Sequence, residues 1–117
     1  MDKEARDLLR EGQKPRGVLS RSNGESMKAF TDRRDRWWRR LKSLNSTIQV
    51  SEDILSQWML DSANISETEK QLVQTTAKNE WKIETISHAL QELFPFVHEK
   101  EGGTAALARQ SKFAYAS

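Results

Sequence analysis

The sequence predicts an all-α fold, a small bundle of about four helices between a disordered N-terminal linker and a disordered C-terminal tail. Apolar residues recur at spacings of three and four in separate segments of the chain, which is the helical period. Residues that cap or end helices stand at the borders of these segments. The segment 46–50 (STIQV) is the only candidate strand, and it is short.

The first convincing helix is predicted from about Glu25 to Asn45. Its apolar residues fall in one arc of about 120° on a helical wheel, and they are Met27, Phe30, Trp37, Leu41 and Leu44, with Ile48 just beyond. Arg34 is the one polar residue inside the arc, and Trp38 lies at its edge. We therefore expect Trp37 in the core and Trp38 half-buried.

The second helix is predicted to begin after Ser51, a candidate N-cap, and to stop near Asn64. Acidic residues follow Ser51 directly, where the helix dipole favours them. Its inner side is expected to hold Ile54, Leu55, Trp58 and Met59.

Ser66 and Glu69 match the capping box, so a third helix is predicted to start there. Its expected inner residues are Leu72, Val73, Thr76 and Ala77. A fourth helix is predicted from about Lys82 to Phe94, where Pro95 ends the regular part. Its apolar stripe is expected to hold Ile83, Ile86, Leu90 and Leu93, continuing to Val97.

The ends of the chain are predicted to stay outside the bundle. Residues 2–11 suit a short helix, but the following stretch "EGQKPRG" breaks it, and residues 12–24 are interpreted as a linker. The predicted organisation is therefore a short helix and flexible linker over 1–23, a helical domain over 24–98 and a disordered tail over 99–117.

Composition excludes several classes of function. The 117 residues include no cysteine, which rules out disulfides, thiol catalysis and Cys-ligated zinc, and which fits a reducing, cytoplasmic location. The sequence contains no apolar run of about 18 residues, so no membrane span is predicted. Charge is uneven, because residues 1–46 hold 13 Lys and Arg against 7 Asp and Glu, whereas residues 47–117 hold 6 against 10. Such a chain can attract a polyanion or stack head to tail on its own copies.

Catalytic and metal-binding patterns are missing from the sequence. His88 is expected to point into solvent and His98 lies after the last helix, without an H-E-x-x-H pattern. No nucleophile elbow or phosphate-binding loop is found. We therefore predict no enzyme, no cofactor and no small-molecule substrate.

The stretch "DRRDRWWRRL" (32–41) allows two interpretations. In the first it is an ordinary core helix, with Asp32–Arg36 and Asp35–Arg39 pairs on the solvent side. In the second it binds nucleic acid, and Trp38 stacks on a base while cations contact phosphates. The candidate nucleic-acid residues are Arg33, Arg34, Arg36, Arg39, Arg40 and Lys42. Of these, Arg33, Arg34, Arg40 and Lys42 are left without a local acidic partner once the two pairs are formed.

Large aromatic side chains are candidates for a partner interface. Trp58 falls on the apolar side of the second helix, and Trp81 stands at the entrance of the fourth. Together with Trp38 they are the candidate residues for contacts between copies.

The order of these elements resembles the capsid-like Gag segment of copia-type long-terminal-repeat retrotransposon polyproteins. The resemblance covers about residues 24–101. It rests on four short motifs in order: Gly24-Glu25-Ser26 before an arginine-rich helix, "MLDSA" (59–63) ending an acid-started helix, Ser66 to Glu69, and Phe94-Pro95 followed by His98.

This resemblance implies an all-α capsid domain that self-associates into particles around element RNA, or a domesticated or decayed relative of one. The Cys-His knuckle that usually binds RNA in this family has no counterpart, because the chain lacks cysteine. The Gln-x3-Glu motif of retroviral capsids and a protease triplet are also missing. The resemblance therefore implies a fragment or short reading frame of a larger polyprotein, with self-association as its main property.

Overall fold

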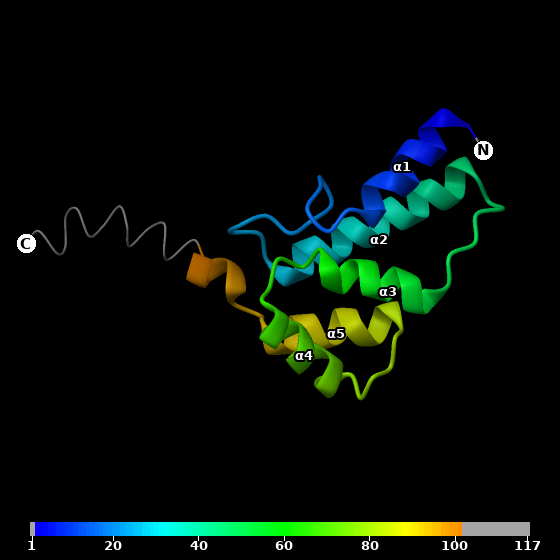
Figure 1. Cartoon of the computed structure of the whole chain (residues 1–117). Coiled ribbons are helices and arrows are strands. Elements are labelled where there is room, and N and C mark those ends of the chain that lie inside the picture. Colours follow the sequence, from blue (N-terminus) through cyan, green and yellow to red (C-terminus); the bar gives the residue numbers. More distant parts are fainter. Residues whose placement is uncertain (1, 102–117) are drawn as a thin grey trace, which may run out of the picture.

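The computed structural model describes residues 2–101, and in this range the chain folds into helices (Figure 1). The helices are α1 (Lys3–Gln13), α2 (Met27–Leu44), α3 (Glu52–Asp61), α4 (Glu67–Thr76) and α5 (Ile83–Leu93), followed by a short helical stretch over 97–101. The all-α prediction is confirmed. Residues 46–50, the only stretch considered as a strand, form a turn and coil.

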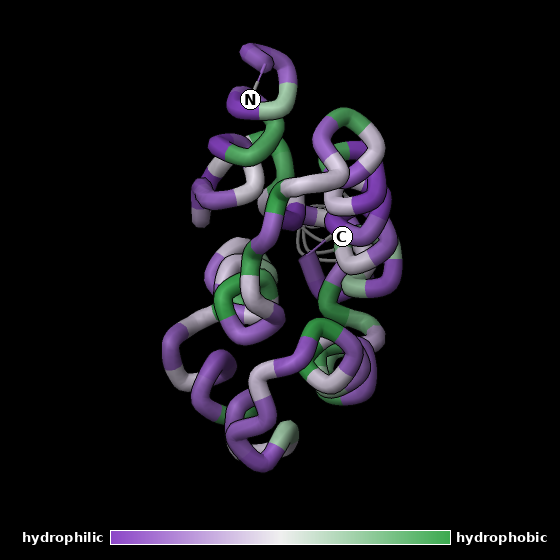
Figure 2. The backbone as a smooth tube through the Cα atoms, turned by 90° about the vertical axis from the view of Figure 1, so that its right-hand side faces the viewer, coloured by the Kyte–Doolittle hydropathy of each residue, from purple (hydrophilic) through white to green (hydrophobic). Residues whose placement is uncertain are grey.

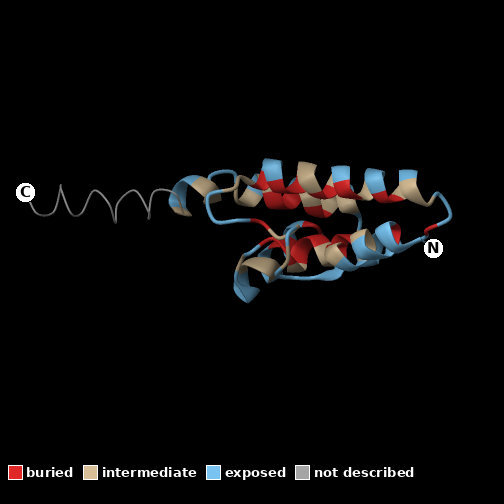
Figure 3. Cartoon of the chain, turned by 90° about the horizontal axis from the view of Figure 1, so that it is seen from above, coloured by how far each residue is buried: buried red, intermediate tan, exposed pale blue. Residues whose placement is uncertain are grey.

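In the view of Figure 1, α1 and α2 lie in the upper part of the molecule, α4 and α5 lie in the lower part, and α3 lies between them. α1 packs on α2, α3 packs on α5, and α5 also contacts α2 and α4. Figure 2 shows hydrophobic positions recurring along the helices, as the sequence period requires. Buried residues lie on the helix sides that face one another, and exposed residues lie outside (Figure 3).

α2 contributes to two separate hydrophobic cores. Its first half places Met27 and Phe30 in the larger core, whose other buried members are Met59, Leu60, Ala63, Val73, Ala77, Ile86, Ala89 and Leu90. Its second half places Trp37 and Leu41 in a smaller core with Ala5, Ile48 and Leu55. The 18 residues of α2 therefore connect the N-terminal part of the chain to the rest.

Local sequence sets the helix ends. The Ser66 hydroxyl accepts a hydrogen bond from the Glu69 amide at 3.1 Å, and the Glu69 carboxylate accepts one from the Ser66 amide at 2.8 Å, which confirms the capping box. Ser51 occupies the N-cap of α3 as predicted, although its side chain makes no capping bond. Lys78 and Asn79 adopt positive φ angles of 55° and 57° and reverse the chain between α4 and α5.

The short helix predicted near the N-terminus is confirmed by α1, but the flexible linker predicted after it was wrong, because residues 2–24 are ordered and packed. Ala5 is fully buried, and the Leu8 carbonyl accepts a hydrogen bond from the Trp37 indole at 2.7 Å. Arg21 is also buried, and its amide donates to the Ser62 carbonyl at 2.8 Å. Polar loop residues are satisfied here by backbone carbonyls of distant segments, which a composition argument does not detect.

The C-terminal boundary was also placed too early. Residues 99–101 were predicted to be tail, but they belong to the helical stretch 97–101, and Glu101 forms an ion pair with Arg21 at 2.6 Å. The remaining part of the predicted tail, 102–117, lies outside the described residues.

Two predicted inner faces were partly wrong. Ile54 on α3 and Leu72 on α4 are 45 % and 47 % exposed, and Thr76 is exposed as well. α4 packs on α5 through Val73 and Ala77, which cover only a narrow stripe. Such a stripe is narrower than the sequence pattern suggested, so apolar residues beside it stay in contact with solvent.

Candidate functional site

The six candidate nucleic-acid residues of α2 fall into two groups in the structure. Arg33, Arg34 and Lys42 are partly or fully buried and bind groups of the same chain, whereas Arg36, Arg39 and Arg40 are exposed. The predicted basic surface is therefore smaller than the sequence suggested.

Arg33 is held by a carboxylate and two carbonyls. Its guanidinium binds both oxygens of Glu25, with the Nε–Oε2 distance at 2.7 Å, and donates to the carbonyls of Val18 and Ser20. The Arg33 guanidinium keeps the pKa of Glu25 below its ordinary value. The expectation that Arg33 lacks an acidic partner was wrong, because Glu25 precedes the helix by two residues and folds back onto it.

Arg34 lies between the two hydrophobic cores and is 3 % exposed. It donates to the Gly12 carbonyl at 2.8 Å and to the Ser62 hydroxyl at 3.1 Å, and its guanidinium lies 5.0 Å from the ring centre of Trp37. Burial lowers the pKa of Arg34 to about 10. Its side chain is therefore structural and does not face a nucleic acid.

Trp37 lies in the core, as predicted, and is 5 % exposed. Trp38 is half-buried, also as predicted, with its ring centre 5.9 Å from that of Trp37. Lys42 lies 5.7 Å from the Trp38 ring and donates to the Ile48 carbonyl at 2.8 Å, which fixes the loop after α2.

Arg36, Arg39 and Arg40 form the outward side of α2. Arg39 pairs with Asp35, as predicted, and Arg40 reaches Glu4 of α1 at 2.9 Å. The predicted Asp32–Arg36 pair does not form. The Asp32 carboxylate pairs instead with the Lys28 ammonium, with Nζ and Oδ2 3.3 Å apart. Exposed pairs of this kind contribute little stability, so they do not prevent these arginines from binding another anion.

The three candidate interface tryptophans are all partly buried. Trp38 and Trp58 pack against the smaller core, and Trp81 packs against the larger one. The exposed large apolar residues of the described chain are Val18, Ile54, Leu72 and Phe96. Ile54 and Leu72 were predicted to be buried, because the helical period alone does not say how wide a stripe of each helix is covered.

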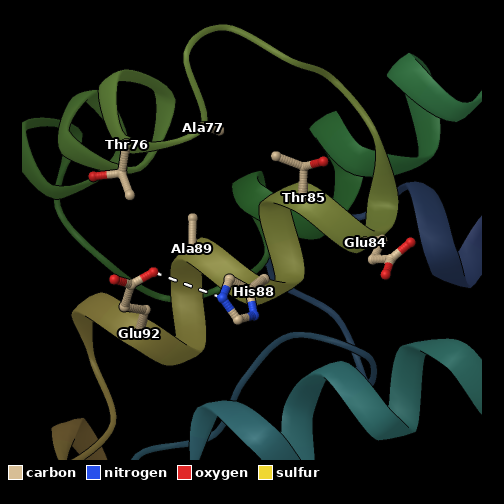
Figure 4. Close-up of a pocket in the computed structure, with 7 residues that line it drawn as sticks. All are labelled: Thr76, Ala77, Glu84, Thr85, His88, Ala89 and Glu92. Atoms are coloured by element: carbon tan, nitrogen blue, oxygen red, sulfur yellow. Dashed lines mark ion pairs between the residues drawn. The ribbon is translucent and has the colours of Figure 1, made fainter.

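A shallow groove of about 370 Å³ runs between α4 and α5, and the sequence analysis did not predict it (Figure 4). Ala77 and Ala89 form its apolar floor. Its lining also includes Thr76, Thr85, Glu84, His88 and Glu92. His88 is exposed, as predicted, and lies 3.7 Å from the Glu92 carboxylate. The spacing of Glu84, His88 and Glu92, four residues apart, is the sequence signal that indicates one shared helix face.

The α1–α2 pair and the α4–α5 pair differ in net charge, although α1 itself is neutral, with three Lys and Arg against three Asp and Glu. α1 and α2 together hold ten Lys and Arg against five Asp and Glu, a net charge of +5. α4 and α5 hold four Glu against one Lys, a net charge of −3. The uneven charge seen along the sequence is therefore separated in space, with the groove on the acidic side.

Comparison with known proteins gives no match, whether with protein-family models, curated proteins or solved structures. Within residues 2–101 no helix is long and apolar enough to cross a membrane. In the same range no three His, Asp or Glu side chains gather closely enough to hold a metal ion.

Proposed function

We propose that this chain is a non-enzymatic structural module that self-associates head to tail, of the capsid-like Gag type that its sequence resembles. The outer face of α1 of one copy meets the acidic α4–α5 groove of the next. The observation that carries this proposal is the opposite net charge of the α1–α2 pair and the α4–α5 pair, with a groove on the second of them.

The groove has the chemistry to receive a basic helix. Its floor of Ala77 and Ala89 is apolar and small, so a helix can approach closely. Glu84 and Glu92 lie about 12 Å apart along α5, two helical turns, and both are exposed. Basic side chains on a docked helix can therefore form ion pairs with the carboxylates of Glu84 and Glu92.

The outer face of α1 is the segment that we assign to this groove. Arg6 and Arg10 are exposed and lie one turn apart, and Leu9 lies between them with a half-buried side chain. Leu9 can cover the alanine floor while the arginines, about 6 Å apart along α1, lie between the two groove glutamates and reach them with their long side chains. Head-to-tail contacts leave a free α1 face at one end of every oligomer and a free groove at the other end. Further copies can therefore be added without limit.

The test is light scattering after size exclusion over a hundredfold range of concentration. Wild-type mass is expected to rise with concentration. Glu84→Gln with Glu92→Gln, and separately Arg6→Gln with Arg10→Gln, are each expected to stay at 13.5 kDa. An equimolar mixture of the two variants retains one complete interface and is expected to stop at a dimer.

Matched controls remove the same charge elsewhere. Glu67→Gln with Glu99→Gln changes exposed carboxylates outside the groove lining, and Arg16→Gln with Arg39→Gln changes exposed arginines outside α1. Both are expected to associate as wild type does. A wild-type protein that stays monomeric at every concentration rules the proposal out.

The second candidate function is nucleic-acid binding, and the observation that favours it is the outward side of α2. Arg36, Arg39 and Arg40 are exposed and lie on adjacent turns. Phosphate contacts make affinity fall steeply with salt. Replacing all three by Gln is expected to flatten the salt dependence of RNA retention without changing the mass of the protein. An unchanged salt slope excludes these residues as the RNA site.

A further inference from the structure

Arg21 is the largest fully buried side chain of the described chain, although it precedes α2 in a loop. A buried cation is costly unless its donors are satisfied. Its guanidinium donates to four backbone carbonyls: those of Ala63 at 2.8 Å, Glu25 at 2.9 Å, Asn64 at 3.1 Å and Ser22 at 3.3 Å. These carbonyls fix the plane of the guanidinium in the fold.

The outer edge of the same guanidinium binds a carboxylate. Glu101 accepts from Nη1 at 2.6 Å and from Nη2 at 2.7 Å, which is the two-pronged geometry that favours carboxylates. The Gly24 amide adds a third donor at 3.0 Å. Gly24 has a φ of +87°, and this backbone conformation presents its amide to the carboxylate.

The receptor and its ligand come from different parts of the chain. Residues 21–25 and 62–64 hold Arg21 through carbonyls and through the bond from its amide to the Ser62 carbonyl. None of these groups belongs to the helical stretch 97–101. The Arg21–Gly24 cradle, defined by these two residues, is therefore built without Glu101, whose side chain is 23 % exposed.

We propose that the Arg21–Gly24 cradle is a binding site for a peptide carboxylate, which Glu101 fills within its own chain and which the 97–101 segment of a second copy can fill in its place. The segment follows Pro95 and the exposed Phe96, so the peptide that carries the ligand leaves α5 through a short surface turn. Exchange of the 97–101 segment between two copies forms the same contacts as within one copy. It therefore joins the copies at a low free-energy cost. Exchange rests on the self-association proposed above, but carboxylate binding by the cradle does not.

The test follows the Gly24 amide by ¹⁵N–¹H NMR in the Glu101→Ala variant. This amide touches the carboxylate directly, so removal of Glu101 is expected to shift its signal. A synthetic peptide with the sequence of residues 94–101 is expected to return the signal toward the wild-type position in a saturable way. The same peptide with Gln in place of its Glu101 carboxylate is expected to have no such effect.

Two controls make the result specific. Glu99→Ala removes an exposed carboxylate of the same helical stretch and is expected to leave the Gly24 signal in place. In wild type, whose cradle already holds Glu101, the Gly24 signal is expected not to move at peptide concentrations that saturate the Glu101→Ala variant. Sodium acetate at matched ionic strength serves as the free carboxylate.

Three outcomes overturn the proposal. A Gly24 signal that does not move on removal of Glu101 shows that the cradle does not hold this carboxylate. Equal effects of the Glu and Gln peptides show that the carboxylate is not what binds. Acetate that acts as strongly as the peptide at equal concentration assigns the site to small free carboxylates instead of a peptide.

Discussion

Three arginines with similar sequence surroundings have different tasks in this protein. Arg33 binds a carboxylate beside the helix, Arg34 bridges two cores, and Arg36 points outward. Their tasks depend on what lies over each side chain. The loop before α2 binds Arg33 through two carbonyls, whereas Gly12 of α1 and Ser62 after α3 bind Arg34. An arginine-rich helix therefore has to be divided residue by residue before a basic surface is assigned to it.

Arg34 is expected to be essential for stability and dispensable for RNA binding. Arg34→Lys keeps the charge but cannot reach both the Gly12 carbonyl and the Ser62 hydroxyl while lying flat on Trp37. The free energy of unfolding is expected to fall by about 1–3 kcal/mol, since a buried acceptor loses its donor. Urea denaturation measures this loss, with Arg39→Lys as the exposed control. Equal stability of the two variants contradicts the structural role of Arg34.

Glu25 and Glu101 are expected to make the fold sensitive to acid. Arg33 lowers the pKa of Glu25, and Arg21 lowers the pKa of Glu101. A carboxylate with a lowered folded pKa stabilises the fold above its unfolded pKa of about 4.3, and this contribution is lost as the pH falls through the folded pKa.

The double variant Glu25→Gln with Glu101→Gln tests this dependence. Its free energy of unfolding is expected to be lower than that of wild type at pH 7 and to change less between about pH 5 and pH 3. Thermal unfolding at a series of pH values gives both curves. Parallel curves for the two proteins contradict the assignment.

Gly12 shows how an entire element depends on one missing side chain. A Cβ built at Gly12 lies 1.9 Å from the Trp37 ring, so α1 can approach α2 only with glycine at this position. The same close approach lets the Gly12 carbonyl accept from Arg34 at 2.8 Å. α1 is therefore fitted to α2, although it contains mostly polar residues.

Gly12→Ala is expected to displace α1 from α2. Overpacking of this kind costs about 1–3 kcal/mol, and the loss here is expected at the upper end because the clash is with a rigid ring. Gln13→Ala on the exposed side of α1 is the control. Chemical denaturation compares the two, and a Gly12→Ala variant as stable as the control argues against the packing of α1 on Trp37.

The elements with strong local signals were predicted correctly from the sequence. The capping box at Ser66 and Glu69 marks the start of α4, and the apolar arc through Trp37 marks the buried side of α2. The packing of residues 1–23 could not be predicted, because it depends on a glycine facing a distant ring and on Arg21 facing distant carbonyls. The groove was missed for a different reason, since α4 and α5 follow one another in sequence but only their packing in space forms it.

The whole molecule separates its charges into a basic side and an acidic side, and this property predicts how association responds to salt. The screening length in water falls from about 10 Å at 0.1 M salt to about 3 Å at 1 M. The mass that wild type reaches at a given concentration is therefore expected to be lower at 1 M salt. Light scattering at both salt concentrations checks this, and a mass that is higher in 1 M salt indicates an apolar interface instead.

Because α2 contributes residues to both cores, it determines which parts of the protein can unfold locally. Backbone amides in the middle of α2 are covered by one core on each side of Arg34, so they can exchange with solvent deuterium only when both cores separate. Amides of α1 and of residues 97–101, which lie at the two ends of the fold, can exchange through local openings. Native-state hydrogen exchange is therefore expected to be slowest in α2, with the two cores unfolding as one cooperative unit.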